Sequence, residues 1–153
     1  MNINKLLKTD IKNALELIWD VFFEFEAPDY ADQGVAYFKD FISLDSIMEK
    51  FDKDKMAFWG CFIDNNLAGV IASLGIGHIS MLFVKKEYHR QGVAKRLFQT
   101  LLDVCKSDDN VKRITVNSSP YAVEVYHRMG FKDTNAEQTL NGIRFTPMEY
   151  AIT

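Results

Sequence analysis

The fold is decided by the stretch Tyr88–Leu97, which reads YHRQGVAKRL. It follows an apolar run, Ile79–Val84, that is typical of a β-strand. Apolar residues with helical spacing come after it: Ala94, Leu97, Phe98, Leu101, Leu102 and Cys105. A short, positively charged turn that contains Gly92 therefore joins a strand to the N-terminus of a helix.

This junction predicts a binding site for an anionic group. The first backbone N–H groups of a helix lack partners within the helix, and the helix dipole adds partial positive charge at the same end. Gly92 lets the backbone approach a ligand closely, because no Cβ intervenes. A phosphate fits such a site, although an ordinary strand–turn–helix corner would show the same single glycine.

A second segment, Thr115–Phe131, continues the pattern. Val111–Val116 is a predicted strand, and Ser119 followed by Pro120 predicts a helix start with Ser119 as the N-cap. Gly130 supplies the left-handed residue that ends this helix before another strand begins. The helix has one apolar face, formed by Ala122, Val125, Tyr126 and Met129.

The two segments resemble the acyl-CoA-binding motifs of the GNAT superfamily of N-acetyltransferases. In the first, His89, Gly92 and Ala94 match Gln/Arg-x-x-Gly-x-Gly/Ala, with His89 in place of Gln or Arg. The second is similar to Asn-x-x-Ala-x-x-x-Tyr-x-x-x-Gly-Phe, with Ser119 where Asn is common. The resemblance covers about residues 63–148, with the two motifs in the order and at the spacing of the family.

The 153 residues predict one α+β domain, since helices come first and strands and helices are then mixed. The resemblance implies a mostly antiparallel sheet of about six or seven strands, with helices on both faces. It also implies a splay between the fourth and fifth strands, at Ile79 and Ile114, where a cofactor enters. The other predicted elements are a weak strand at Asn2–Leu7, helices after Asp10, over Ala31–Ile42 and over Asp45–Phe51, a hairpin of Met56–Ile63 with Leu67–Leu74, and a last strand at Ile143–Ala151.

The resemblance implies acetyl-CoA as co-substrate and no metal. Backbone groups of one strand would pair with the pantetheine arm, and the N–H groups from Arg90 to Lys95 would hold the pyrophosphate. Arg90, Lys95 and Arg96 could add side-chain charge, although a solvated helix face is an equal reading for Arg96. The residues predicted to bind the cofactor are Leu82, Phe83, Val84, Arg90, Gln91, Gly92, Val93, Ala94, Lys95, Asn117 and Ser119. For Ser119 a helix cap is the favoured alternative.

Tyr126 matches the family tyrosine that lies beside the CoA sulfur, so the resemblance implies that it is the general acid. A packing tyrosine whose hydroxyl is bonded to a backbone carbonyl is the alternative. The base stays open, because several groups could take the proton from the amine. The candidates are Glu24, Glu26, Asp29, His78 and Ser80, or a chain of water molecules.

The resulting hypothesis is an N-acetyltransferase that moves an acetyl group to a primary amine of a small molecule, protein or peptide, by direct attack in a ternary complex. The alternative is a non-catalytic acyl-CoA-binding module that senses the cofactor or regulates a partner. A nucleotide-phosphate binder is a weaker third reading, since the loop lacks the Lys-Ser/Thr ending of a P-loop. The sequence does not identify the amine that accepts the acetyl group. A few of the abundant aromatic residues could line its pocket: Phe22, Phe23, Phe25, Tyr30, Tyr37, Phe38 and Phe145.

Net charge, the length of apolar stretches and the positions of the cysteines limit the kinds of partner and environment that the chain can have. With a net charge of −3, we expect no general attraction to nucleic acids or membranes. No stretch of the sequence approaches the ~20 apolar residues that a membrane helix needs. Cys61 and Cys105 lie far apart and predict free thiols in a reducing cytoplasm. An exposed strand near Ile143 could pair with its copy in a homodimer.

Overall fold

One mixed sheet of eight strands runs through the computed structural model, which describes all of residues 1–153. The strand order is β1-β2-β3-β4-β5-β8-β6, with β7 paired to β8 outside this path. All pairs are antiparallel except β4 with β5, as in the predicted fold class. The strands are β1 (Asn2–Lys5), β2 (Met56–Ile63), β3 (Asn66–Leu74), β4 (His78–Val84), β5 (Arg113–Ser118), β6 (Lys132–Asp133), β7 (Gln138–Leu140) and β8 (Ile143–Ala151).

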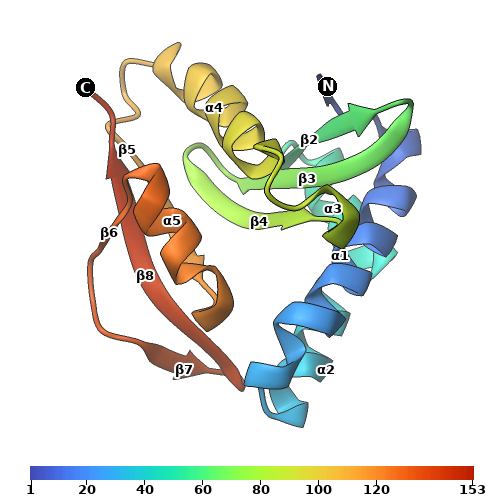
Figure 1. The fold of residues 1–153 in the computed structure, drawn as a ribbon, viewed down its shortest axis with the longest axis vertical. Helices are drawn as coiled ribbons and strands as arrows, with labels where there is room; N and C mark the ends of the chain where they lie inside the picture. Colours follow the sequence, from blue (N-terminus) through green and yellow to red (C-terminus); the bar gives the residue numbers. More distant parts are fainter.

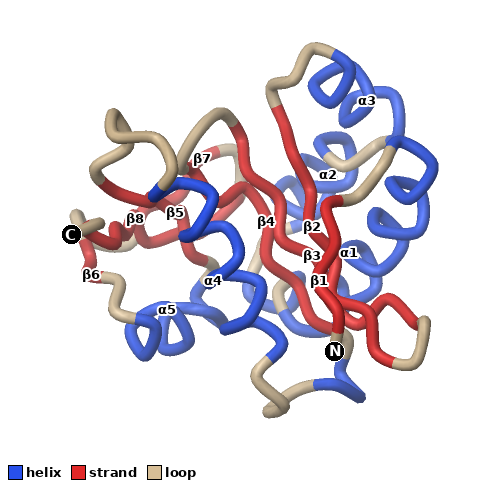
Figure 2. The backbone as a smooth tube through the Cα atoms, turned by 90° about the horizontal axis from the view of Figure 1, so that it is seen from above, coloured by secondary structure: helices blue, strands red, loops and turns tan.

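Helices cover both faces of the sheet, as predicted. Figure 2 shows α1, α2 and α3 together on one side of the central strands, with α4 and α5 on the other side. The α-helices are α1 (Ile11–Phe25), α2 (Asp32–Phe41), α3 (Leu44–Asp52), α4 (Val93–Lys106) and α5 (Val123–Met129). Four single-turn 3-10 helices precede or follow them: η1 (Lys8–Asp10), η2 (Ala27–Asp29), η3 (Lys86–Tyr88) and η4 (Pro120–Ala122).

The sheet separates two hydrophobic cores of similar size, one of 16 and one of 15 buried residues. Successive residues of a strand point to opposite faces, so Phe58 and Val70 pack under α1 while Trp59 and Ile71 pack under α4. Because both faces are buried, the central strands are continuous apolar runs rather than alternating ones. This is why the hairpin of β2 and β3 could be predicted with nearly correct bounds.

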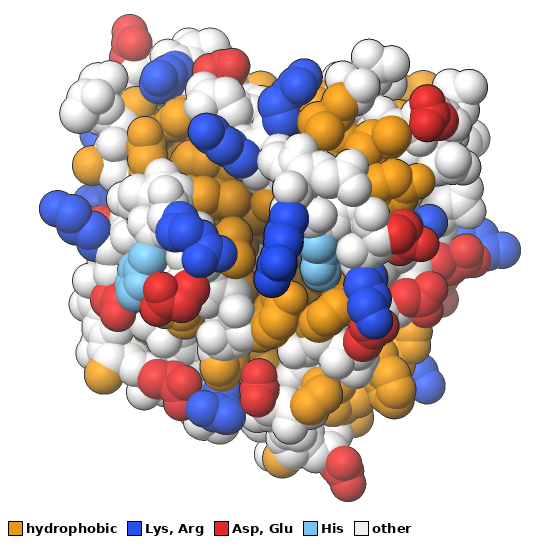
Figure 3. Space-filling view, viewed as in Figure 1, with side chains coloured by type: hydrophobic (Ala, Val, Ile, Leu, Met, Phe, Trp, Pro, Cys, Tyr) orange, Lys and Arg blue, Asp and Glu red, His pale blue; other side chains and the backbone are white.

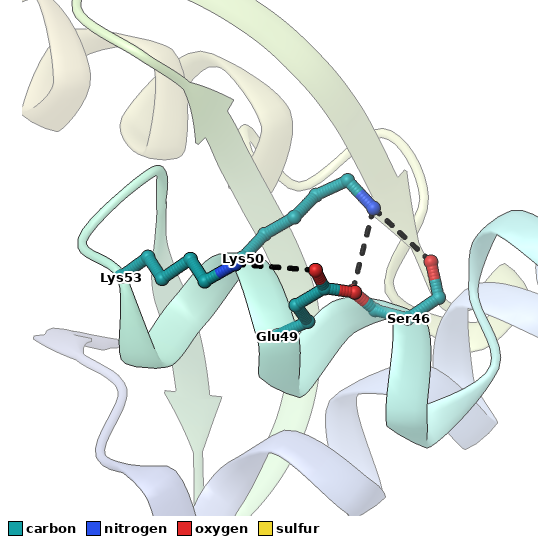
Figure 4. Close-up of polar contacts among 4 residues, drawn as sticks. All are labelled: Ser46, Glu49, Lys50 and Lys53. Atoms are coloured by element: carbon teal, nitrogen blue, oxygen red, sulfur yellow. Dashed lines mark hydrogen bonds and ion pairs between the residues drawn. The ribbon is translucent and has the colours of Figure 1, made fainter.

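The outer surface of α3 is fixed by side-chain pairs one helical turn apart. Lys53 Nζ lies 3.2 Å from Glu49 Oε1, and Lys50 Nζ donates to the carbonyl and hydroxyl oxygens of Ser46 at 3.3 and 3.1 Å (Figure 4). Exposed pairs of this spacing contribute about 0.3–0.5 kcal/mol each. They stabilise the helix locally and lie outside the cavities described below.

β4 and β5 pair only over the first two residues of β4 and the two middle residues of β5. The parallel register joins His78 to Thr115 and Ile79 to Val116, and no further pair follows. β4 then continues along β3 while β5 continues along β8, and Figure 1 shows the two strands diverging. The predicted splay is therefore confirmed. It leaves the edge of β4 that faces β5 without a strand partner up to Val84.

The C-terminal hairpin contains the one strand that the sequence did not predict. β7 is fully exposed and pairs with Ile143–Phe145 of β8 through a turn at Asn141 and Gly142, whose φ angles are 54° and 79°. Since β7 and β6 occupy one edge of β8, that edge has partners within the chain. The homodimer stays a prediction. Every helix is too short or too polar to span a lipid bilayer.

Candidate active site

The splay between β4 and β5 opens into a cleft of about 720 Å³. Its walls come from the end of β4, the start of α4 and the side of α5 that carries Tyr126. Figure 3, drawn from the same side as Figure 1, shows hydrophobic side chains in a hollow near the middle of this face, with Lys and Arg side chains beside it. The cleft thus combines an apolar floor with a cationic rim.

The start of α4 presents unpaired N–H groups to the cleft. Gly92 is the N-cap with a φ of 80°, no side chain caps the helix, and the first helical bond runs from Arg96 N to Gly92 O at 3.0 Å. The N–H groups of Val93, Ala94 and Lys95 therefore have no partner within the helix. A Cβ on Gly92 would meet no heavy atom within 4 Å, so the space at this helix end is open to a ligand.

His89 takes a structural part in this loop. Its Nε2 lies 2.8 Å from the carbonyl oxygen of Val84, and its ring centroid lies 5.1 Å from that of Phe25. A carbonyl oxygen can only accept, so Nε2 carries the proton and donates it. The bond ties the turn to the end of β4 and precedes Arg90, which has the unusual φ of 62°. The imidazole therefore holds the loop in place of the Gln or Arg of the family motif.

Eight of the predicted cofactor residues line the cleft: Leu82, Phe83, Val84, Arg90, Gly92, Val93, Ala94 and Lys95. Gln91 does not, because its side-chain amide donates to the Glu87 carbonyl at 3.2 Å. Arg96 also lies outside the lining, whereas Arg128 is part of it. The sequence analysis missed Arg128, although its place two residues after Tyr126 in the second motif offered a signal.

A second cavity of about 260 Å³ lies behind the cleft. Asn117 and Ser119 line this second cavity and not the cleft. Its other walls come from α1, the residues that flank η2, α2, most of β4, and residues of β3, β5 and β8. Five residues line both spaces and form the junction between them: Glu26, Leu82, Phe83, Ala122 and Tyr126.

Tyr126 is 5% exposed and lies at this junction, with its ring edge-on to Phe131 at 5.2 Å between centroids. Burial, with a smaller effect from the negative charge of Glu26, raises the pKa of Tyr126, and no hydrogen bond contributes to the shift. The phenol therefore keeps its proton at neutral pH. A hydroxyl bonded to a backbone carbonyl, the packing alternative, is not what the structure shows.

Glu26 is the carboxylate of the junction. Burial raises the pKa of Glu26 from 4.5 to about 8, the hydroxyl of Ser119 opposes the shift, and the charge of Asp29 adds to it. Ser119 Oγ faces this carboxylate but is buried without a hydrogen bond of ordinary geometry. Ser119 is the N-cap residue of η4, as expected, but its hydroxyl caps no backbone N–H group there.

The candidate bases fall into two groups, according to whether they line the second cavity. Glu24 and Asp29 are exposed and line neither cavity, and Glu24 lies 3.7 Å from Lys86 Nζ. Glu26, His78 and Ser80 all line the second cavity. Nδ1 of His78 is 2.8 Å from Thr115 Oγ1, and burial lowers the pKa of this imidazole. His78 is therefore neutral at pH 7.

Residues 26–152 match the family model described as the acetyltransferase (GNAT) domain. The chain therefore belongs to the GNAT family of acetyltransferases. None of the curated proteins matches its sequence at a significant level.

Solved structures share the fold at low sequence identity. A GCN5-related N-acetyltransferase from Rhodopseudomonas palustris has a TM-score of 0.83 and 16% identity, over 99% of this chain and 95% of that chain. The PaiA N-acetyltransferase of Thermoplasma acidophilum, solved with coenzyme A, gives 0.80 and 19%, over 99% and 98%. The spermidine N-acetyltransferase of Vibrio cholerae, solved with CoA and spermine, gives 0.67 and 18%, over 98% and 94%.

Proposed function

We propose that this protein transfers an acetyl group from acetyl-CoA to a primary amine by direct attack in a ternary complex. The observation that carries the proposal is that two separate cavities meet at Tyr126, whose buried phenol keeps its proton. One cavity has the cationic rim and open helix end that suit a pyrophosphate. The other has room for the amine.

The cleft residues fit acetyl-CoA. The N–H groups of Val93, Ala94 and Lys95 would hold the pyrophosphate, and the side chains of Arg90 and Arg128 would add positive charge. The free edge of β4 at Leu82–Val84 would pair with the amide groups of the pantetheine arm, much as an added strand does. Two structural neighbours, with coenzyme A in one and CoA and spermine in the other, support this assignment.

The bound co-substrate supplies the acetyl group as an activated thioester. Tyr126 then holds a proton where the thiolate leaves, and its burial keeps that proton on the phenol until it is needed. Cys61 and Cys105 line neither cavity, so no thiol of the chain is placed to carry the acetyl group. This supports direct transfer between the two substrates.

Isothermal titration with acetyl-CoA tests the cofactor site, with Gly92→Asp as the variant. The new carboxylate would lie at the open helix end and repel the pyrophosphate, so we expect micromolar binding by the wild type and at least a 100-fold loss in the variant. Release of CoA thiol with a panel of primary amines then tests the reaction. Binding without turnover for any amine would favour the sensor, and no binding by the wild type would contradict both functions.

A further inference from the structure

Resting on this proposed function, we propose that the second cavity takes a monoamine with a compact apolar or aromatic body, and that Glu26 binds its ammonium group and accepts a proton from it. The walls of this cavity, its charges and one buried hydroxyl all bear on which amine binds and which group takes its proton.

The walls of the second cavity are mostly aromatic and aliphatic. Phe22 stacks on Phe38 with centroids 4.0 Å apart, and Phe38 in turn lies 6.0 Å from Phe83 on β4. Three further aromatic side chains come from η2's end and from α2: Tyr30, Tyr37 and Phe41. Aliphatic side chains also line the cavity, from Ile79, Met81, Val116 and Ile143, beside the polar side chains of His78, Ser80, Asn117 and Ser118. Such a surface favours an apolar or aromatic group over a sugar or an extended polar chain.

The cavity has a single ionisable acid. Glu26 is the only carboxylate among its lining residues, neither Lys nor Arg lines it, and His78 is neutral. One ammonium group can therefore be paired inside the cavity when Glu26 is ionised, and the positive charge of the ammonium group itself favours that form. A second ammonium group held inside the cavity would find no counter-charge among the lining residues, which is unfavourable. A monoamine satisfies these charges, whereas a polyamine does not.

Ser119 provides an independent sign of a ligand. The residue is only 7% exposed, and its hydroxyl faces Glu26 without a hydrogen bond of ordinary geometry. Buried polar atoms are rarely left in this state. An ammonium group beside Glu26 would donate hydrogen bonds both to the carboxylate and to the Ser119 hydroxyl, so that each buried group would have a hydrogen-bond partner.

Glu26 is also placed to take part in the proton balance. The ammonium group gives one proton to its carboxylate, and the nitrogen lone pair forms a C–N bond with the acetyl carbonyl carbon while the C–S bond breaks. The sulfur takes a proton from Tyr126, the second nitrogen proton replaces it on the phenol as the amide forms, and Glu26 then releases its proton to solvent. The products are the amide, the free thiol and one released proton. The groups that face Glu26 are Asp29 and Tyr30 near η2, Ser119 before η4 and Tyr126 on α5.

The first test compares 2-phenylethylamine with spermidine as acceptors in the thiol-release assay. We expect kcat/KM for 2-phenylethylamine to be at least 10-fold higher. An equal or higher value for spermidine would overturn the inference while leaving the proposed acetyltransferase intact. If the protein binds acetyl-CoA but acetylates only peptide amines, the monoamine inference is likewise overturned and the proposed acetyltransferase stands. If the protein does not bind acetyl-CoA at all, the proposed function itself is contradicted.

The second test addresses Glu26 directly. Glu26→Gln keeps the size of the side chain, so we expect acetyl-CoA affinity within 2-fold of the wild type and kcat/KM for 2-phenylethylamine lowered at least 100-fold. Glu24→Gln is the matched control, since that carboxylate lies two residues away on the exposed side of α1, and its activity should not change. The rise of kcat/KM with pH near 8 should also disappear in Glu26→Gln. A wild-type pH profile in that variant would overturn the role of Glu26.

Discussion

The phenol of Tyr126 is buried, keeps its proton and lies between the two cavities, so the loss of its oxygen should affect chemistry more than binding. In Tyr126→Phe we expect kcat to fall roughly 100-fold, the lower end of the range for general acid–base groups. KM for acetyl-CoA should change less than 3-fold, because the ring still packs on Phe131. Steady-state kinetics check this, and an unchanged kcat would remove Tyr126 from the acid role.

Glu26 should make stability depend on pH in an unusual direction. Its pKa is about 8 in the folded protein and near 4.5 in the unfolded chain, so folding takes up a proton between these values. The free energy of unfolding therefore falls as pH rises from 4.5 to 8 and levels off above 8. The variant Glu26→Gln has no carboxylate at this position, so its free energy of unfolding does not fall for this reason over the same pH range.

We accordingly expect Glu26→Gln to be more stable than the wild type at pH 9, on the order of a few kcal/mol, and nearly equal to it at pH 5. Chemical denaturation at the two pH values measures the difference. A variant that is less stable at pH 9 would show that the carboxylate is not desolvated in the fold.

Sequence could foresee individual residues wherever a motif constrained the backbone. The left-handed conformation of Gly130, the turn at Gly92 and the place of Tyr126 follow from local pattern. Asn117 and Ser119 were assigned to the cofactor, yet they line the second cavity. The partners that decide their position, above all Glu26 directly after α1, are distant in sequence and could not be inferred from spacing.

Among the elements, α2 and the β7–β8 turn meet at two glycines. A Cβ on Gly34 would overlap the carbonyl oxygen of Gly142, so both positions need to lack a side chain. Gly34→Ala should push the turn away from α2 and loosen the second cavity, which both elements border through Tyr37 and Ile143.

For Gly34→Ala we expect KM for the amine to rise at least 5-fold, with acetyl-CoA affinity unchanged because the cleft lies elsewhere. Kinetics and titration together measure this split. Lys39→Ala, an exposed change on the same helix, serves as the control. Equal effects on both substrates would contradict separate cavities.

Most elements were predictable because apolar periodicity is strong in them. The bounds of α1, β2 and β8 follow from runs that bury one or two faces. β7 was missed because all three of its residues are exposed and show no alternation; the hairpin turn, not burial, defines it.

For the whole molecule, the splay means that only two residue pairs join the parallel strands β4 and β5. Acetyl-CoA would therefore contact both halves of the sheet. We expect its addition to slow amide hydrogen exchange at the start of α4 and also in α5, on opposite sides of the cleft. Mass spectrometry checks this, with Gly92→Asp as the unprotected control; protection confined to α4 would contradict a ligand that spans the splay.

The contact of Gly34 with Gly142 also has a consequence for how the protein assembles. The cleft is formed mainly between β4 and α5, whereas the second cavity needs α2 to meet a hairpin near the end of the chain. Contacts between distant segments form slowly, because a long loop must close first. We therefore expect the cofactor site to take shape early, and a newly synthesised chain to gain its amine pocket only after its last strand has left the ribosome.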